Sequence, residues 1–239
     1  MFDDYDDFKP QINVDSPFSS DTKLSQLQNR IPDDTLSITQ RRLSLSQQSR
    51  FISYCDERLM DIQRKFVQSR GLNPQNGYSG LAPLLQDLKA LVDFIWYSID
   101  GRPNTEYLLT EDPSDVSRDQ YTGCKSTYFG QSAYLIKIAD DLLDYTEKFE
   151  LKSVDSEQQS VALSKLFKLL FILDTIFSRL IDGTIPGKAK MSGTDSVRLT
   201  GIAERTRTRL PWYFEQQDIH GYHYEVSRIY EKALERCGN

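Results

Sequence analysis

The chain has 239 residues, of which 38% are hydrophobic and 27% charged, and this composition excludes a fully disordered protein. No run approaches the ~20 consecutive apolar residues of a membrane span, and residues 1–20 lack the basic start and apolar stretch of a secretory signal. Three widely spaced cysteines exclude a disulfide framework. We therefore expect a protein of a reducing compartment that is neither secreted nor inserted in a membrane.

The net charge of -6 is concentrated at the start of the chain, where residues 1–40 hold eight acidic and three basic side chains. This acidity argues against nucleic-acid binding by the whole surface. Residues 1–45 are rich in Asp, Ser and Gln and have no sustained apolar period, which predicts a disordered acidic leader. The first eight residues interleave aromatic side chains with aspartates. We favour a solvated terminus there over a segment that orders on a basic partner.

Helical periodicity begins at residue 46. The first predicted helix spans residues 47–70, and its core face repeats every three or four residues, at Phe51, Cys55, Leu59, Ile62 and Phe66. A second predicted helix has Ser79 as its N-cap and ends at Asp100-Gly101. It is apolar almost all round, so we expect it to lie at the centre of the fold.

Residues 102–129 are polar and contain two prolines, which predicts a long mobile connection. After this connection, four segments with a helical pattern follow to the end of the chain. Pro211 is expected to end the third of them. These further predicted helices span residues 131–149, 158–181, 196–209 and 218–236, and Asp182-Gly183 is the predicted stop of the second one.

The helical pattern contains an internal repeat. Nine positions between residues 48 and 66 match positions 83 residues later, among them Ile52 with Leu135 and Met60 with Leu143. The following helices match at an offset of 82 residues. We therefore predict an all-α bundle of about six helices over residues 46–239, built from a duplicated helical hairpin. Its parts are repeat one at 46–101, the connection at 102–129, repeat two at 130–183 and a C-terminal helical hairpin at 194–237.

One motif suggests enzyme chemistry. Asp140, Asp141 and Asp144 fit the Asp-Asp-x-x-Asp pattern, in which carboxylates on one helix face hold Mg²⁺ against a diphosphate, as in terpenoid and prenyl-diphosphate enzymes. The sequence has no second acidic motif of this kind, so we favour a solvated helix face. His220 and His223 are too few to define a zinc site. We expect no catalytic residue, no cofactor and no metal.

A basic and aromatic segment is the predicted docking surface. Arg198, Arg205 and Arg209 are followed by Trp212, and arginine beside tryptophan is typical of interface hot spots. The exposed part of Phe94, Trp96 and Tyr97 is the second predicted contact. The alternatives are a solvated basic face ahead of core aromatics, or a clasp of this patch by the acidic leader.

Two serines stand in short kinase-like motifs. Ser44 follows Arg41-Arg42-Leu43, and Ser16 precedes Pro17. Phosphate on either serine would add about -1.5 to -2 charge units.

Four segments resemble a known family. They are SQQSRFI at residues 46–52, LVDFIWYSI at 91–99, YLIKIADDLLDY at 134–145 and LDTIFSRL at 173–180. Together they are similar to the fungal accessory subunit six of the general transcription factor TFIIH. The resemblance implies a nuclear, non-catalytic protein that binds the DNA-translocase subunit of TFIIH and promotes its dissociation after transcription initiation, without sequence-specific nucleic-acid binding. A cytoplasmic helical adaptor in trafficking or signalling is the alternative, and the prenyl-diphosphate enzyme is a third.

Overall fold

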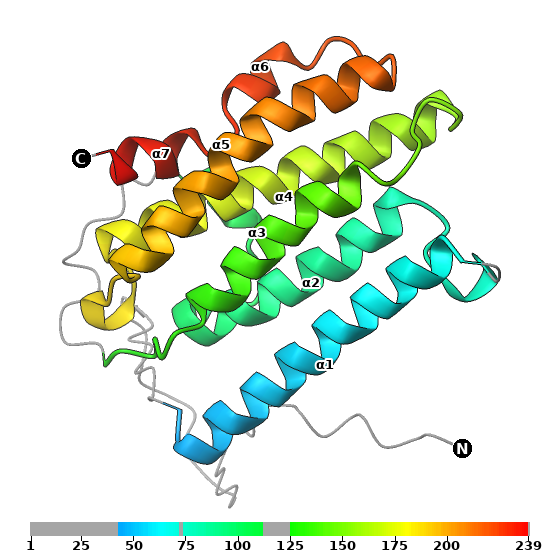
Figure 1. Ribbon diagram of the computed structural model, residues 1–239. Helices are drawn as coiled ribbons and strands as arrows, with labels where there is room; N and C mark the ends of the chain where they lie inside the picture. Colours follow the sequence, from blue (N-terminus) through cyan, green and yellow to red (C-terminus); the bar gives the residue numbers. More distant parts are fainter. Residues whose placement is uncertain (1–42, 72–73, 112–124, 239) are drawn as a thin grey trace, which may run out of the picture. The chain divides into compact units, whose positions relative to one another are not determined.

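The computed structural model describes residues 43–71, 74–111 and 125–238, and in these ranges the protein is all-α, without strands (Figure 1). The predicted leader lies outside the described residues up to residue 42, and residues 43–45 already belong to the folded part. Within the described ranges the α-helices are α1 (Leu45–Ser69), α2 (Leu81–Asp100), α3 (Ser132–Thr146), α4 (Ser156–Asp182), α5 (Gly193–Gln216), α6 (His223–Ser227) and α7 (Glu231–Cys237). The short 3-10 helices of the same described ranges are η1 (Pro74–Asn76), η2 (Glu106–Leu109) and η4 (Pro186–Lys188).

The first helix forms as its apolar period predicts. Ser44 is the N-cap of α1: its Oγ accepts a hydrogen bond from the Gln47 backbone N–H at 3.3 Å, and the Gln47 side chain accepts from the Ser44 N–H at 2.9 Å. This reciprocal capping box satisfies two donors that a helix start leaves open. The buried side chains of α1 are Phe51, Cys55, Leu59 and Ile62, and Phe66 is half-buried.

Helices α2 and α4 form the centre of the bundle. α4 packs against α2, α3, α7 and η2, and α2 packs against α1, α3 and α4. Such helices must be apolar on more than one face. The inner residues of α4 are therefore almost continuously buried from Leu169 to Leu180, with Phe171 half-buried, and the prediction of a central second helix is confirmed.

Helices α2 and α4 end in the same way. Gly101 and Gly183 have φ values of 81° and 73°, a left-handed conformation in which a Cβ is strained, and each donates its N–H to a carbonyl four residues earlier. Both predicted stops are therefore confirmed. The shared cap agrees with the offset of 82 residues, but the duplication and the domain boundaries stay predictions.

Ser79 is not the N-cap of α2. The helix begins one residue later, with Gly80 at the cap and no side-chain hydrogen bond to the first turn. Leu81 is 2% exposed and anchors this end of the helix in the core. Burial of Leu81 therefore decides where α2 starts, rather than a polar cap.

Pro211 does not close α5, which continues to Gln216. A proline inside a helix costs about 3 kcal/mol. Beyond it, Tyr213 and Phe214 are 3% and 4% exposed, and the Tyr213 hydroxyl donates to the Phe149 carbonyl at 2.7 Å. Burial of two aromatic side chains contributes about 2–3 kcal/mol each, so the helix continues in spite of the proline.

The predicted helix at residues 218–236 is also wrong as one element, because it is divided into α6 and α7. Tyr230, between them, has a φ of 52° and is 0% exposed, as is Ile229. The left-handed backbone of Tyr230 is not helical, so it separates the two helices while both side chains stay in the core. Asp174 of α4 stabilises the new helix start by accepting hydrogen bonds from the N–H groups of Lys232 and Ala233, at 3.2 and 2.8 Å.

Asp174 makes the stability of the bundle pH-dependent. Burial raises the pKa of Asp174 from 3.8 to about 6, against the lowering effect of its two backbone hydrogen bonds. The folded state thus holds this proton more tightly than the unfolded state, so the stabilisation is complete below pH 4 and is lost as the pH rises through 6.

We expect the substitution Asp174→Asn to remove this loss. The wild type loses this stabilisation between pH 4 and pH 7, whereas Asp174→Asn has no proton to lose. The difference in the free energy of unfolding, variant minus wild type, should therefore increase by about 2–3 kcal/mol over this pH range. Urea unfolding at the two pH values measures the change. The exposed Asp218→Asn is the control, and an identical pH profile for Asp174→Asn and the wild type would contradict the assignment.

Candidate functional site

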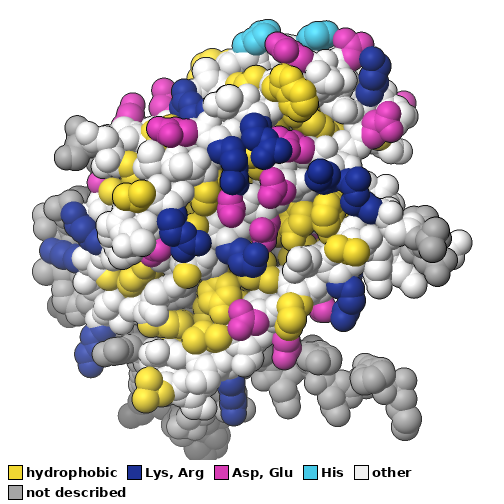
Figure 2. Space-filling model, viewed as in Figure 1, with side chains coloured by type: hydrophobic (Ala, Val, Ile, Leu, Met, Phe, Trp, Pro, Cys, Tyr) yellow, Lys and Arg dark blue, Asp and Glu magenta, His cyan; other side chains and the backbone are white. Residues whose placement is uncertain are grey.

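The predicted basic face of α5 lies against acidic residues of α3. Arg205 forms a hydrogen-bonded ion pair with Asp140, and Arg209 forms one with Glu147 and lies 3.7 Å from Asp144. We call these five residues the α3–α5 seam. Figure 2 shows the alternation of basic and acidic side chains along the middle of this face.

The seam changes what the arginines offer to a partner. Arg205 and Arg209 are compensated by carboxylates of the same molecule, so they are not a free basic patch. Exposed pairs of this kind contribute only about 0–1 kcal/mol each to stability. Arg198 and Trp212 share this face of α5, because the spacings of seven, four and three residues bring all four side chains to one side of the helix. Trp212 is 61% exposed.

The seam also involves the candidate metal ligands. Asp140 and Asp144, which would hold Mg²⁺ in the enzyme hypothesis, face arginines that compete with a cation for the same carboxylates. Across residues 43–71, 74–111 and 125–238, no group of three or more His, Cys, Asp or Glu side chains could hold a metal ion. His220 lies 3.0 Å from Asp218, and His223 is not part of this contact.

The second predicted contact surface is only partly accessible. Trp96 is 0% exposed, so its assignment as a docking residue is corrected. Phe94 is half-buried and stacks on Phe51 with 5.3 Å between the ring centroids. Tyr97 is 39% exposed. The sequence indicated an apolar helix but not the segment that covers it.

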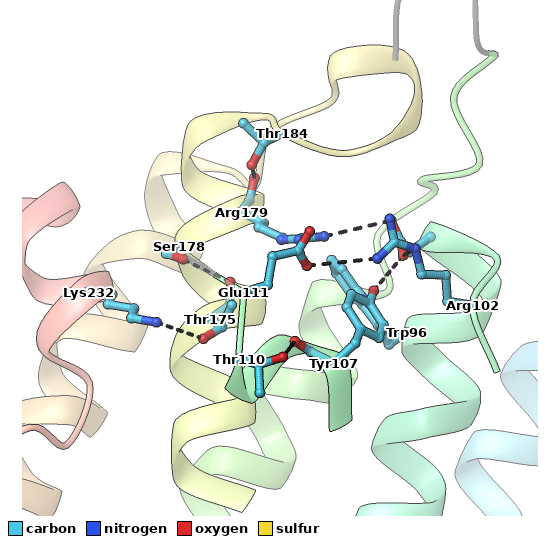
Figure 3. A network of polar contacts seen from close by, with 11 residues as sticks. Trp96, Arg102, Tyr107, Thr110, Glu111, Thr175, Ser178, Arg179, Thr184 and Lys232 are labelled. Atoms are coloured by element: carbon cyan, nitrogen blue, oxygen red, sulfur yellow. Dashed lines mark hydrogen bonds and ion pairs between the residues drawn. The ribbon is translucent and has the colours of Figure 1, made fainter. Parts of the chain in front are cut away.

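That cover is the start of the predicted mobile connection, held by a buried polar network (Figure 3). The Trp96 Nε1–H donates to the Tyr107 hydroxyl at 2.7 Å, and this hydroxyl donates to Asp100 at 2.5 Å. Arg179 of α4 is 0% exposed; it forms a short ion pair with Glu111 and lies 3.9 Å from Asp100. The network ties residues 102–111 to both central helices.

The described ends of the connection are thus packed on the bundle. Thr105 and Leu108 are 0% exposed, and Thr127 donates its hydroxyl hydrogen to the Ile99 carbonyl at 2.7 Å. Residues 112–124 lie outside the described residues. The predicted mobility therefore does not apply to residues 105–108, which the core fixes in place.

Burial makes two titratable groups unreactive, Tyr107 of this network and Cys55 of α1. It raises the pKa of the Tyr107 phenol, with the Asp100 carboxylate as the next cause, so the phenol stays protonated and acts as a donor. It also raises the pKa of Cys55 to about 12, with Asp56 contributing. A thiol with so high a pKa is a poor nucleophile. These groups hold the fold together rather than perform chemistry.

One open groove, of about 620 Å³, runs between the start of α2 and the turn from α3 to α4. Its lining combines apolar side chains with Ser79, Gln158 and the acids Glu150, Asp155 and Glu157. None of the described lining residues is a histidine, cysteine, lysine or arginine that would pair with these acids. The groove therefore lacks the acid, base and nucleophile set of an active site.

Ser44, predicted as a kinase site, is exposed at the N-cap of α1. The first turn of α1 carries no acidic side chain, and phosphate near a helix N-terminus is favourable. Phosphorylation of Ser44 stays a prediction, and Ser16 lies outside the described residues.

Sequence reasoning missed one surface. The outward face of α1 carries four exposed apolar side chains, Leu45, Ile52, Met60 and Val67. Their spacing of seven or eight residues was a signal for this row, since two helical turns return to the same face.

No helix among the described residues has the length and apolar character to cross a bilayer.

No solved structure matches the chain. Residues 77–221 match the family described as TFB6, subunit 11 of the general transcription factor TFIIH. The chain is 55% identical, over an alignment of 256 residues, to the general transcription and DNA repair factor IIH subunit TFB6 of Saccharomyces cerevisiae. The alignment covers 100% of this chain and 74% of that protein. Identity at this level over the whole chain contradicts the alternative of a cytoplasmic helical adaptor. The chain belongs to the TFB6 family of subunits of TFIIH, a nuclear transcription and repair factor.

Proposed function

We propose that this chain is a non-catalytic interaction subunit that binds the DNA-translocase subunit of TFIIH and promotes its dissociation. The observation that carries the proposal is the 55% identity to a TFIIH subunit over the full chain. The described part of the chain is all-α, and the lining of its groove between α2 and the α3–α4 turn has no histidine, cysteine, lysine or arginine, which agrees with a binding role. Dissociation needs only a differential affinity, in which this chain binds the free translocase subunit more tightly than the assembled one.

A release assay tests the proposal. TFIIH is immobilised through a subunit other than the translocase, and the translocase subunit that leaves is followed over time with and without this chain. We expect the chain to increase the released fraction and to leave with the translocase subunit as a complex. Equal release with and without the chain would contradict the proposal.

The α5 face is the contact surface that we propose for this interaction. Trp212, with its large exposed area, is the anchor, and the charged pairs of the α3–α5 seam together with Arg198 form a polar rim around it. An aromatic centre with a polar rim is the usual anatomy of an interface. Tyr97 and Phe94 form a smaller second contact on α2.

We expect Trp212→Ala to weaken binding of the purified translocase subunit about tenfold or more, as a loss of ~1.4 kcal/mol or more implies. Fluorescence anisotropy with the labelled chain measures the dissociation constant. Tyr224→Ala is the matched control, because Tyr224 is also an exposed aromatic, at 67%, and lies on α6. Equal affinities for wild type and Trp212→Ala would remove Trp212 from the contact.

A further inference from the structure

Among the described residues, α1 is an edge helix, and no other described helix packs on its outer apolar face. It packs against α2 and η1, with a lighter contact to α3 through the Tyr134 hydroxyl, which donates to Asp56 at 2.9 Å. α1 lies at the margin of the bundle in Figure 1. Its outer apolar row consists of Leu45, Ile52, Met60 and Val67, which are 82%, 42%, 59% and 61% exposed.

The matching positions of α3 are buried. At the offset of 83 residues, Ile52 corresponds to Leu135 and Met60 to Leu143, which are 0% and 2% exposed. α3 packs against α2 and α4 and also against α5. Two helices with related sequences thus differ in how far the corresponding faces are covered: α4 and α5 both pack on α3, and neither is among the main contacts of α1.

The acidic residues follow the same correspondence. Asp140 and Asp144, which face Arg205 and Arg209 of α5, correspond to Glu57 and Asp61 of α1. The third acid of the seam has no counterpart, because Arg64 stands at the position of Glu147. Arg64 forms an ion pair with Asp61 at 2.6 Å. Glu57 has no ion-pair partner among the described residues, and Asp56 has only the hydrogen bond from the Tyr134 hydroxyl, so neither acid of this face is paired with a cation there.

We propose that the outer face of α1 binds a basic amphipathic helix of a TFIIH subunit, in the way that α5 covers α3. The apolar side of that helix packs on Ile52, Met60 and Val67, and an arginine or lysine pairs with Glu57. Helix recognition in which one apolar face covers another is a common docking mode. The inference rests on the proposed role of this chain as an interaction subunit.

A second copy of this chain fits the face less well. The four apolar residues are spaced symmetrically about Asp56, so an antiparallel two-fold pairing in register would place Asp56 at the axis. Two carboxylates would then face each other, and like charges at an interface are unfavourable. The basic helix of a different subunit brings the opposite charge.

Photo-cross-linking identifies the occupant. The full chain carries p-benzoylphenylalanine in place of Met60 and is assembled into purified TFIIH, and the cross-linked peptide is identified by mass spectrometry. We expect a peptide of another subunit with apolar residues at helical spacing and at least one Arg or Lys. The control has the same photoreactive residue in place of Val161, which is 45% exposed on α4. A cross-link to a second copy, to this chain itself or to nothing would overturn the inference.

Substitutions test the energetics. We expect Met60→Asp and Glu57→Lys each to weaken association with TFIIH by about fivefold or more. The matched controls are Val161→Asp on α4 and Glu150→Lys in the turn between α3 and α4. Thermal unfolding verifies that the exposed variants stay folded, and unchanged affinity in both α1 variants would contradict the inference.

The outcomes separate the two proposals. A chain that associates through α1 but fails to release the translocase subunit contradicts the proposed function alone. A chain that releases the translocase subunit and is insensitive to both α1 substitutions contradicts this inference alone. A chain that neither joins TFIIH nor releases its subunit contradicts both.

Discussion

The substitution Arg179→Met is expected to reduce the free energy of unfolding by about 3–5 kcal/mol, because it removes the cation from a buried ion pair and leaves the acids in place. Arg179 is 0% exposed and pairs with Glu111, with Asp100 at 3.9 Å. Its guanidinium also lies 6.0 Å from the Trp96 ring and 5.8 Å from the Tyr107 ring. Without it, the two carboxylates keep only the half-exposed Arg102, at 3.5 Å from Asp100 and 3.8 Å from Glu111, as a cation.

A double variant distinguishes the lost pair from lost packing. Glu111→Gln combined with Arg179→Met removes one acid together with the buried cation, so we expect the double variant to be about 1–3 kcal/mol more stable than the sum of the single effects predicts. Urea unfolding followed by circular dichroism measures all four proteins. Additive effects, or a loss below ~1 kcal/mol for Arg179→Met, would show that the network does not hold residues 102–111.

The substitution Trp96→Ala has an effect of similar size for a different reason. Trp96 is the largest fully buried side chain, and its truncation leaves a cavity and takes the hydrogen-bond donor from Tyr107. Large aromatic truncations in a core cost about 3–5 kcal/mol. We expect a loss of this size in the free energy of unfolding.

Tyr97→Ala is the matched control for Trp96→Ala. Tyr97 is the next residue of α2 and is 39% exposed, so its truncation should cost about 1 kcal/mol or less. Equal losses for the two variants would contradict the division of this segment into a core residue and a surface residue. The comparison also tests the correction of Trp96 from docking residue to core residue.

Short-range patterns predicted the helices well because helix formation is mainly a matter of spacing between near neighbours. The stripe from Phe51 to Ile62 and the stops at Gly101 and Gly183 needed no knowledge of distant residues. Pro211 misled the prediction for the opposite reason. Its cost was local, but the burial of Tyr213 and Phe214 that outweighs it involves Phe149 in the turn after α3 and Phe167 of α4.

The contact surface was the harder problem. Arg205 and Arg209 were correctly placed on one helix face, but the carboxylates that compensate them lie 62 to 65 positions earlier in the chain. Charge compensation at that separation depends on how α3 and α5 pack. The same holds for Trp96, whose cover comes from a segment that the sequence indicated as mobile.

The amino-acid sequence by itself determined the helical class, most helix boundaries and the resemblance to a TFIIH subunit, since these depend on composition, period and motif. Only the tertiary structure decided which polar and aromatic side chains remain accessible: it closed the arginine face with carboxylates of α3, buried Trp96 and left the outer row of α1 open. Accessibility is a property of the packed molecule, because each face is covered by residues distant in the chain.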